Sequence, residues 1–106
     1  MPSGNCAASC MKVRILESAR EDLREGYRFY EQQQEGIGDY VLDMLSAEID
    51  SLALYGGIHA MRSGHHRLLS ARFPFAVYYR IERGELAVRA VLDCRRDPAW
   101  IRKRLK

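Results

Sequence analysis

The spacing of apolar and polar residues changes twice along the chain, from a strand period to a helix period and back. Residues 11–16 alternate, with Val13 and Ile15 on one face and Lys12 and Arg14 on the other. An alternation of period two indicates a half-buried strand. The sequence therefore predicts a short first strand over residues 11–16.

Two stretches with helical spacing follow. The first begins at Ser18, where Ser18 and Glu21 have the spacing of a capping box, and it ends near Gln34. Its apolar residues recur at steps of three and four, and they are Ala19, Leu23, Tyr27 and Tyr30. The second stretch ends at Gly56-Gly57, and its inner face is Val41, Leu42, Leu45, Ile49 and Leu52. Because few residues separate the two, we expect an antiparallel helical hairpin.

The period returns to two after Ser63-Gly64. Residues 66–73 and 75–81 predict two strands with Pro74 between them, and residues 86–93 predict a third after a turn at residues 82–85. Asp97-Pro98 has the pattern of an N-cap followed by proline, which predicts a short C-terminal helix through Leu105. The order is β-α-α-β-β-β-α, an α+β fold with an antiparallel sheet packed against a helical hairpin.

Length and composition are those of one small domain. The chain has 106 residues, of which 47% are hydrophobic. We expect residues 11–106 to form the domain and residues 1–10 to be a flexible or non-native extension, since small polar residues dominate them. No apolar run reaches the roughly 18 residues that a membrane span needs. The odd cysteine count, with Cys6 and Cys10 in the extension, favours a reducing cytoplasm over a disulfide framework.

Charge divides the chain into an acidic and a basic half. Residues 1–55 carry five basic and ten acidic residues, whereas residues 56–106 carry twelve basic and four acidic ones. Arginine supplies fourteen of the seventeen cations, and its planar guanidinium suits bidentate contacts to phosphate and carboxylate. The second half is therefore suited to an anionic partner, or else it is a solvated face paired with the acidic helices.

Three motifs in register resemble the RelE/ParE toxin superfamily. Residues 67–81 (RLLSARFPFAVYYRI) are similar to the central hairpin of ParE-type toxins, and residues 90–98 (AVLDCRRDP) to their closing segment. In the first helix, Asp22-Leu23 and residues 29–31 resemble a third family segment. The resemblance covers nearly all of residues 11–106, and it implies the fold described above.

The resemblance implies the toxin of a type II toxin–antitoxin (plasmid stabilisation) system. In one branch the toxin binds DNA gyrase, and in another it cleaves messenger RNA on the ribosome. A cognate antitoxin neutralises both, in a complex that can be a heterotetramer. We expect the ParE-like activity, with a ribosome-dependent endoribonuclease and a degenerate, non-toxic antitoxin-binding member as the alternatives.

Target or nucleic-acid contacts are expected from a set of basic and aromatic residues, namely Arg67, Arg72, Arg95, Arg96, Tyr79 and Trp100. If the chain were a ribonuclease, Arg67 and Arg96 would stabilise the charged phosphate, as the resemblance implies. Asp93 stands where the family often has histidine, and Ala76 where the nuclease branch has arginine, so the catalytic acid and base stay unknown.

No cofactor or metal is expected. Adjacent His65 and His66 would point to opposite faces of a strand, and no cysteine or carboxylate stands at a ligand spacing beside them.

Overall fold

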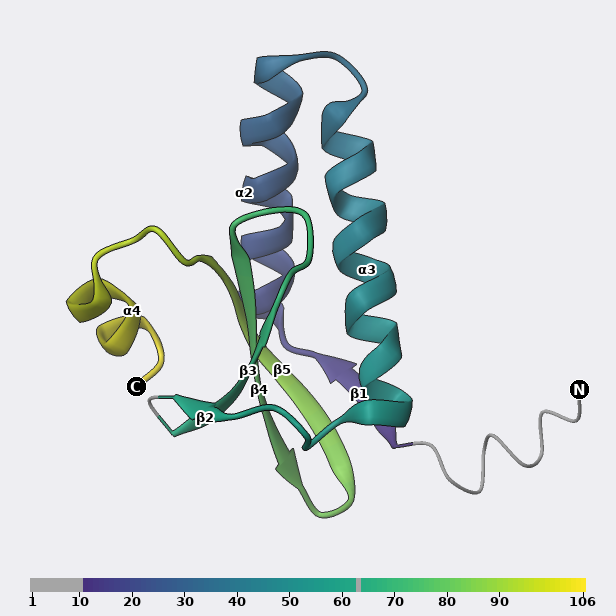
Figure 1. Cartoon of the computed structure of the whole chain (residues 1–106), viewed down its shortest axis with the longest axis vertical. Helices are drawn as coiled ribbons and strands as arrows, with labels where there is room; N and C mark the ends of the chain where they lie inside the picture. Colours follow the sequence, from purple (N-terminus) through teal and green to yellow (C-terminus); the bar gives the residue numbers. More distant parts are fainter. Residues whose placement is uncertain (1–10, 63) are drawn as a thin grey trace, which may run out of the picture.

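The computed structural model describes residues 11–62 and 64–106, so the prediction for residues 1–10 lies outside the described residues. The elements in chain order are β1 (Lys12–Ile15), α2 (Glu17–Gln33), α3 (Ile37–Tyr55), β2 (Met61–Arg62), β3 (His65–Leu69), β4 (Phe75–Glu82), β5 (Glu85–Asp93) and α4 (Pro98–Arg104). The helices α2 and α3 lie side by side as a hairpin (Figure 1). The α+β class and the helical hairpin are confirmed.

The sheet is mixed, in the order β1-β5-β4-β3-β2. Strands β3, β4 and β5 form the expected antiparallel meander. Strand β1 pairs in parallel with β5, Lys12 beside Glu85 and Ile15 beside Val88, so the prediction of an antiparallel sheet does not hold at this edge. Parallel neighbours need a long crossover, and here the hairpin together with the meander provides it.

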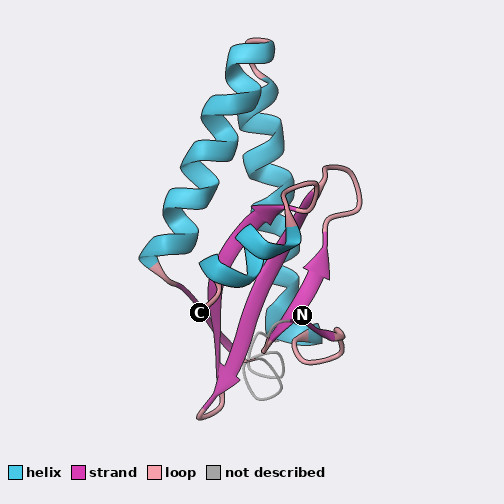
Figure 2. Ribbon diagram, turned by 90° about the vertical axis from the view of Figure 1, so that its left-hand side faces the viewer, coloured by secondary structure: helices cyan, strands magenta, loops and turns pink. Residues whose placement is uncertain are grey.

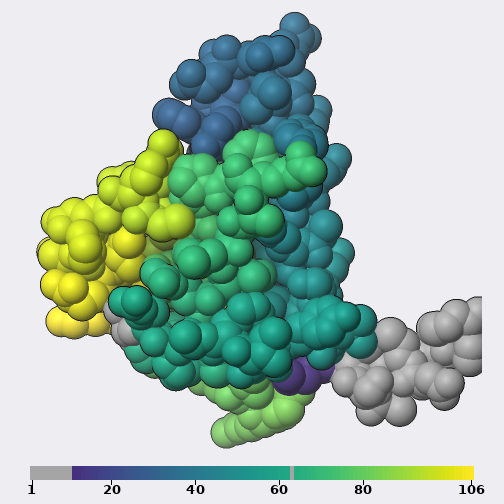
Figure 3. All heavy atoms as spheres, viewed as in Figure 1, coloured from purple at the N-terminus to yellow at the C-terminus, as the bar shows by residue number. Residues whose placement is uncertain are grey.

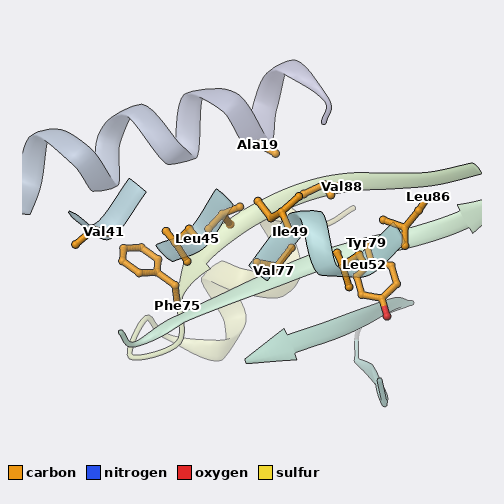
Figure 4. Close-up of a cluster of buried hydrophobic side chains, with 11 residues drawn as sticks. Ala19, Val41, Leu45, Ile49, Leu52, Phe75, Val77, Tyr79, Leu86 and Val88 are labelled. Carbon is orange, nitrogen blue, oxygen red and sulfur yellow. The ribbon is translucent and has the colours of Figure 1, made fainter. Parts of the chain in front are cut away.

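Each face of the sheet has its own core. Toward the hairpin, Phe75, Val77 and Tyr79 of β4 pack with Leu45 and other residues of the hairpin (Figure 4). On the opposite face, a smaller cluster joins Ala76, Tyr78, Ala90 and Leu92 to Leu105 beyond α4. Figure 2 shows α4 lying against the strands and apart from the hairpin. The chain therefore places its last helix on the face that the hairpin leaves open.

A β-bulge at Arg89 links the sheet to the start of α2. Tyr78 pairs with Ala90 and Tyr79 pairs with Val88, which leaves Arg89 as the extra residue. The Ser18 hydroxyl donates a 2.8 Å hydrogen bond to the Arg89 carbonyl. The predicted capping box is therefore wrong, since the residue at the N-cap is Leu16, which makes no side-chain cap. The serine hydroxyl binds the bulge instead.

The predicted strand over residues 66–73 is too long. Strand β3 ends at Leu69, and residues 71–74 form bends before β4. Glu48 of α3 holds this turn, because its carboxylate accepts a 2.9 Å hydrogen bond from the Ala71 amide. The two-residue strand β2, paired with β3, was not predicted, because so short a segment shows no period.

Candidate functional site

Arginine side chains surround a small cleft beside α4. The cleft has a volume of about 180 Å³, and its lining residues are Arg62, Arg67, Tyr78, Cys94, Arg96, Pro98, Ile101 and Arg102. In Figure 3 the C-terminal segment (yellow) lies against the green and teal strands that form the rest of the cleft. Strands β2 and β3, the loop after β5 and α4 each supply one arginine.

Sheet register and helix docking explain how these residues meet. Arg67 of β3 pairs with Tyr78 of β4, so both side chains lie on the same face of the sheet, toward α4. Leu105 and Ile101 pack onto this face, and the docked helix brings Arg102 beside the cleft. The cleft therefore exists only when α4 is docked.

A part-buried ion pair ties the end of α4 to α2. Arg104 donates to the carboxylate of Asp22 and to the Ser18 carbonyl, 3.3 Å away. The second Asp22 oxygen accepts a 3.0 Å hydrogen bond from the Val91 amide on β5. Burial raises the pKa of Asp22, which the Val91 hydrogen bond and the Arg104 charge only partly oppose. This one carboxylate joins α2, β5 and α4.

Within residues 11–62 and 64–106, none of the four cleft arginines has a salt bridge to a carboxylate. Arg96 lies 4.2 Å from the ring centre of Trp100, a cation–π contact that keeps the positive charge. Other arginines of the chain are neutralised, such as Arg24 by Glu17 and Glu21. Guanidinium groups that make no salt bridge and gather around one cleft favour an anion there.

The cleft is suited to binding an anion, phosphate in particular. Guanidinium groups contact phosphate oxygens bidentately, and the Tyr78 hydroxyl adds a hydrogen-bonding group. The lining holds no histidine and no carboxylate, which are the usual partners in acid–base catalysis. The cleft can therefore bind a charged group, but it lacks the histidine or carboxylate that usually transfers protons in catalysis.

The structure brings two of the predicted arginines together and separates two others. Arg67 and Arg96 both line the cleft. Arg72 instead donates a 2.8 Å hydrogen bond to the Tyr40 hydroxyl on α3. Arg95 makes two hydrogen bonds to the Asp93 carboxylate, of 3.0 and 2.7 Å, and these lower the pKa of Asp93. Neither Arg72 nor Arg95 lines the cleft.

The two aromatic predictions have different outcomes. Trp100 is partly exposed, beside the cleft and stacked on Arg96. The prediction that Tyr79 contacts a target is wrong, since its side chain is 0% exposed and lies in the main core. The Tyr79 hydroxyl accepts a 2.9 Å hydrogen bond from the Gly57 amide and also contacts Nδ1 of His59. Because neighbouring residues of a strand face opposite sides, Tyr78 is the one that reaches the cleft.

Sequence reasoning missed Arg62 and Arg102. Arg62 lies in the two-residue strand β2, and Arg102 is one of three basic residues in the last turn of α4. The excess of arginine in the second half is the only signal that includes them, and it does not single them out. In the part of the chain that the structure describes, there is no group of three metal-ligating side chains, and no helix is long and apolar enough to cross a membrane.

Comparison with solved structures gives a likeness in fold. No protein-family model matches the chain, and no curated protein sequence matches it. A solved structure described as the chromosomal ParDE TA system from P. aeruginosa contains a chain with the same fold. The TM-score is 0.70 and the identity 18%, over 78% of this chain and 95% of that chain. The fold expected from the ParE resemblance is therefore confirmed.

Proposed function

We propose that the chain is the toxin of a type II toxin–antitoxin system, and that it acts by binding an anionic surface of an essential target. The arginine cleft is the observation on which the proposal depends. Its four guanidinium groups make no salt bridge to a carboxylate among the described residues, and only that of Arg96 feels a nearby carboxylate, Asp93, so most of their charge is available to a ligand. The fold shared with a chain of a ParDE toxin–antitoxin structure supports the class of function.

The leading target is DNA gyrase, and a cognate antitoxin in the same cytoplasm would neutralise the toxin. Support for binding over cleavage comes from the cleft itself, which offers four cations, one phenol and the thiol of Cys94 but no histidine or carboxylate. Ribosome-dependent RNA cleavage is the second candidate, since the same cations would also stabilise a phosphorane. It would need Tyr78 or Cys94 to take part in proton transfer.

The test is inducible expression of the whole chain in bacteria. We expect growth to stop, with filamentation and a DNA-damage response. Exchanging Arg67 and Arg96 for alanine removes two of the four cleft cations and should restore growth at equal protein level. The matched control is Arg72→Ala, which removes an arginine outside the cleft and should stay toxic.

Other outcomes would identify the other candidates. Immediate arrest of translation with cut messages indicates the endoribonuclease, and loss of that activity in Tyr78→Phe would support a role for the phenol in proton transfer. Normal growth with the unchanged chain, at verified expression, indicates a non-toxic member and rules out the proposal. Toxicity that survives the loss of both Arg67 and Arg96 would show that the cleft is not the site.

A further inference from the structure

A second groove lies between the two helices of the hairpin, where Ile15 of β1 also lines it, and it shares no lining residue with the arginine cleft. Its volume is about 640 Å³, and it follows the line where α2 and α3 meet. The apolar part of its lining includes Leu23 and Tyr27 of α2 and Leu42 of α3, which are only half-buried. Apolar side chains that stay half-exposed along a helical hairpin are available to a partner.

The two walls of this groove differ in charge. On the α2 side the charged lining residues are Arg20, Arg24 and Arg28, one on each turn of the helix. Glu17 and Glu21 pair with Arg24, so Arg20 and Arg28 supply the positive charge of this wall. The α3 side contributes Asp39. Helix α3 contains four acidic residues and no lysine or arginine, so all its charged side chains are negative. Arg28 and Asp39 are both exposed, and neither makes an ion pair within the part of the chain that the structure describes.

A groove with one basic and one acidic wall is complementary to a copy of itself. Consider a two-fold axis that runs along the hairpin, above the groove. Rotation about it places α2 over the α3 of the second copy, while each residue keeps its height along the hairpin. Arg28 and Asp39 lie at the same end of one groove, so each would face the opposite charge on the second copy. A two-fold axis perpendicular to the helices would instead place α2 of one copy over α2 of the other, so that the arginines of the two copies would face each other.

We propose that the chain forms a symmetric dimer through this face, in which the two hairpins make an antiparallel four-helix bundle. The apolar floor of one groove covers that of the other, and the Arg28–Asp39 contact occurs twice because the interface is two-fold symmetric. The arginine cleft lies on the α4 side of the sheet, away from this interface, so both copies keep it open. The proposal does not depend on the toxin function.

Charge reversal tests the proposal, with the mass of the full-length chain measured by light scattering after size-exclusion chromatography. The wild-type chain should have the mass of a dimer. Arg28→Glu and Asp39→Arg should each have the mass of a monomer, because each places like charges face to face twice. A mixture of the two variants should recover the dimer mass. In the mixed dimer the introduced glutamate of one variant would face the introduced arginine of the other, and the remaining Arg28 would face the remaining Asp39.

The control is Arg83→Glu, a charge reversal at the exposed β4–β5 turn outside the groove, which should stay dimeric. Circular dichroism checks that each variant keeps its helices. If Asp39→Arg loses helix content, the folded Arg28→Glu variant alone decides the test. A monomeric wild-type chain overturns the proposal, and so does a folded Arg28→Glu variant that still dimerises. A mixture that stays monomeric rules out the proposed pairing.

Discussion

At the scale of single residues, Asp22 is the carboxylate that joins α2, β5 and the end of α4. It accepts a hydrogen bond from Val91 of β5 and pairs with Arg104 near the C-terminus, although only 9% of its side chain is exposed. Burial of the charged form outweighs these favourable contacts and raises the pKa of Asp22. Its contribution to stability therefore depends on pH in the direction opposite to that of an ordinary paired carboxylate.

We predict that Asp22→Ala lowers the free energy of unfolding by about 1–3 kcal/mol, because it leaves the Val91 amide without an acceptor and the Arg104 guanidinium without its carboxylate. Urea denaturation measures the change. The control is Glu25→Ala, an exposed residue of the same helix, which should stay within about 0.5 kcal/mol of wild type. Equal losses in the two variants would show that the Asp22 contacts contribute nothing specific.

The raised pKa of Asp22 gives a separate prediction for pH. A folded pKa above the unfolded value adds stability that is complete below the unfolded pKa and is lost as pH rises through the folded one. Asp22→Asn keeps an oxygen acceptor but cannot ionise. The stability of wild type relative to Asp22→Asn should therefore fall as pH rises above the ordinary carboxyl range. A difference that grows with pH would contradict this assignment.

At the scale of the elements, Glu31 of α2 caps the start of the following helix, α3. The Glu31 carboxylate accepts hydrogen bonds from the amides of Gly36 and Gly38, at 3.0 and 2.9 Å, and so satisfies free amides at the start of α3. Gly38 lies so close to Tyr27 that a Cβ there would be 2.7 Å from the Tyr27 carbonyl oxygen. These contacts fix the tight turn between the helices.

We predict that Glu31→Ala costs about 1 kcal/mol in the free energy of unfolding, as the loss of other helix caps does. Glu31→Gln should cost less, since its amide oxygen can still accept one of the two bonds. Thermal unfolding followed by circular dichroism measures both. Glu35→Ala, in the exposed turn itself, is the comparison, and a loss as large as that of Glu31→Ala would contradict the capping role.

Local patterns predicted most of the elements but few of the contacts between them. The helical hairpin, the β3–β5 meander and the Asp97 N-cap follow from residues within one turn of each other, and the structure has all three. Ser18 has the spacing of a capping residue, yet its hydroxyl bonds to Arg89, far along the chain. The parallel pairing of β1 with β5 is equally non-local.

The same limit applies to the cleft. Arg67 and Arg96 were found through a family resemblance, whereas Arg62 and Arg102 join them only through the docking of α4 and the pairing of β2. For Tyr78 and Tyr79, alternation showed that they face opposite sides, but it does not say which side holds the main core. Contacts between distant segments determine both which arginines line the cleft and which tyrosine is buried in the main core.

At the scale of the whole molecule, the docking of α4 couples stability to the site. Leu105 is 4% exposed and packs with Tyr78 and Leu92 in the smaller core. We predict that Leu105→Ala costs about 2 kcal/mol, the lower end for a buried leucine, because this core is small and near the chain end. The same change should abolish the growth arrest, since Arg96 and Arg102 would no longer be held near Arg67.

Lys103→Ala, an exposed change on the same helix, is the control and should affect neither stability nor growth arrest. Hydrogen exchange at Ala90 and Leu92 reports whether the second face of the sheet opens when α4 is released. A Leu105→Ala variant that is less stable but as toxic as wild type would show that the cleft does not need a docked α4.

The parallel pairing of β1 with β5 determines when the sheet can form during synthesis of the chain. During synthesis β1 is among the first elements to leave the ribosome, and the strand that it pairs with is the last strand to be made. The pairing closes a loop that contains most of the chain, and contacts between such distant segments form slowly. The sheet thus cannot close, and the arginines cannot gather beneath α4, before translation is nearly complete. A chain cut short before β5 would therefore have neither the complete sheet nor the arginine cleft.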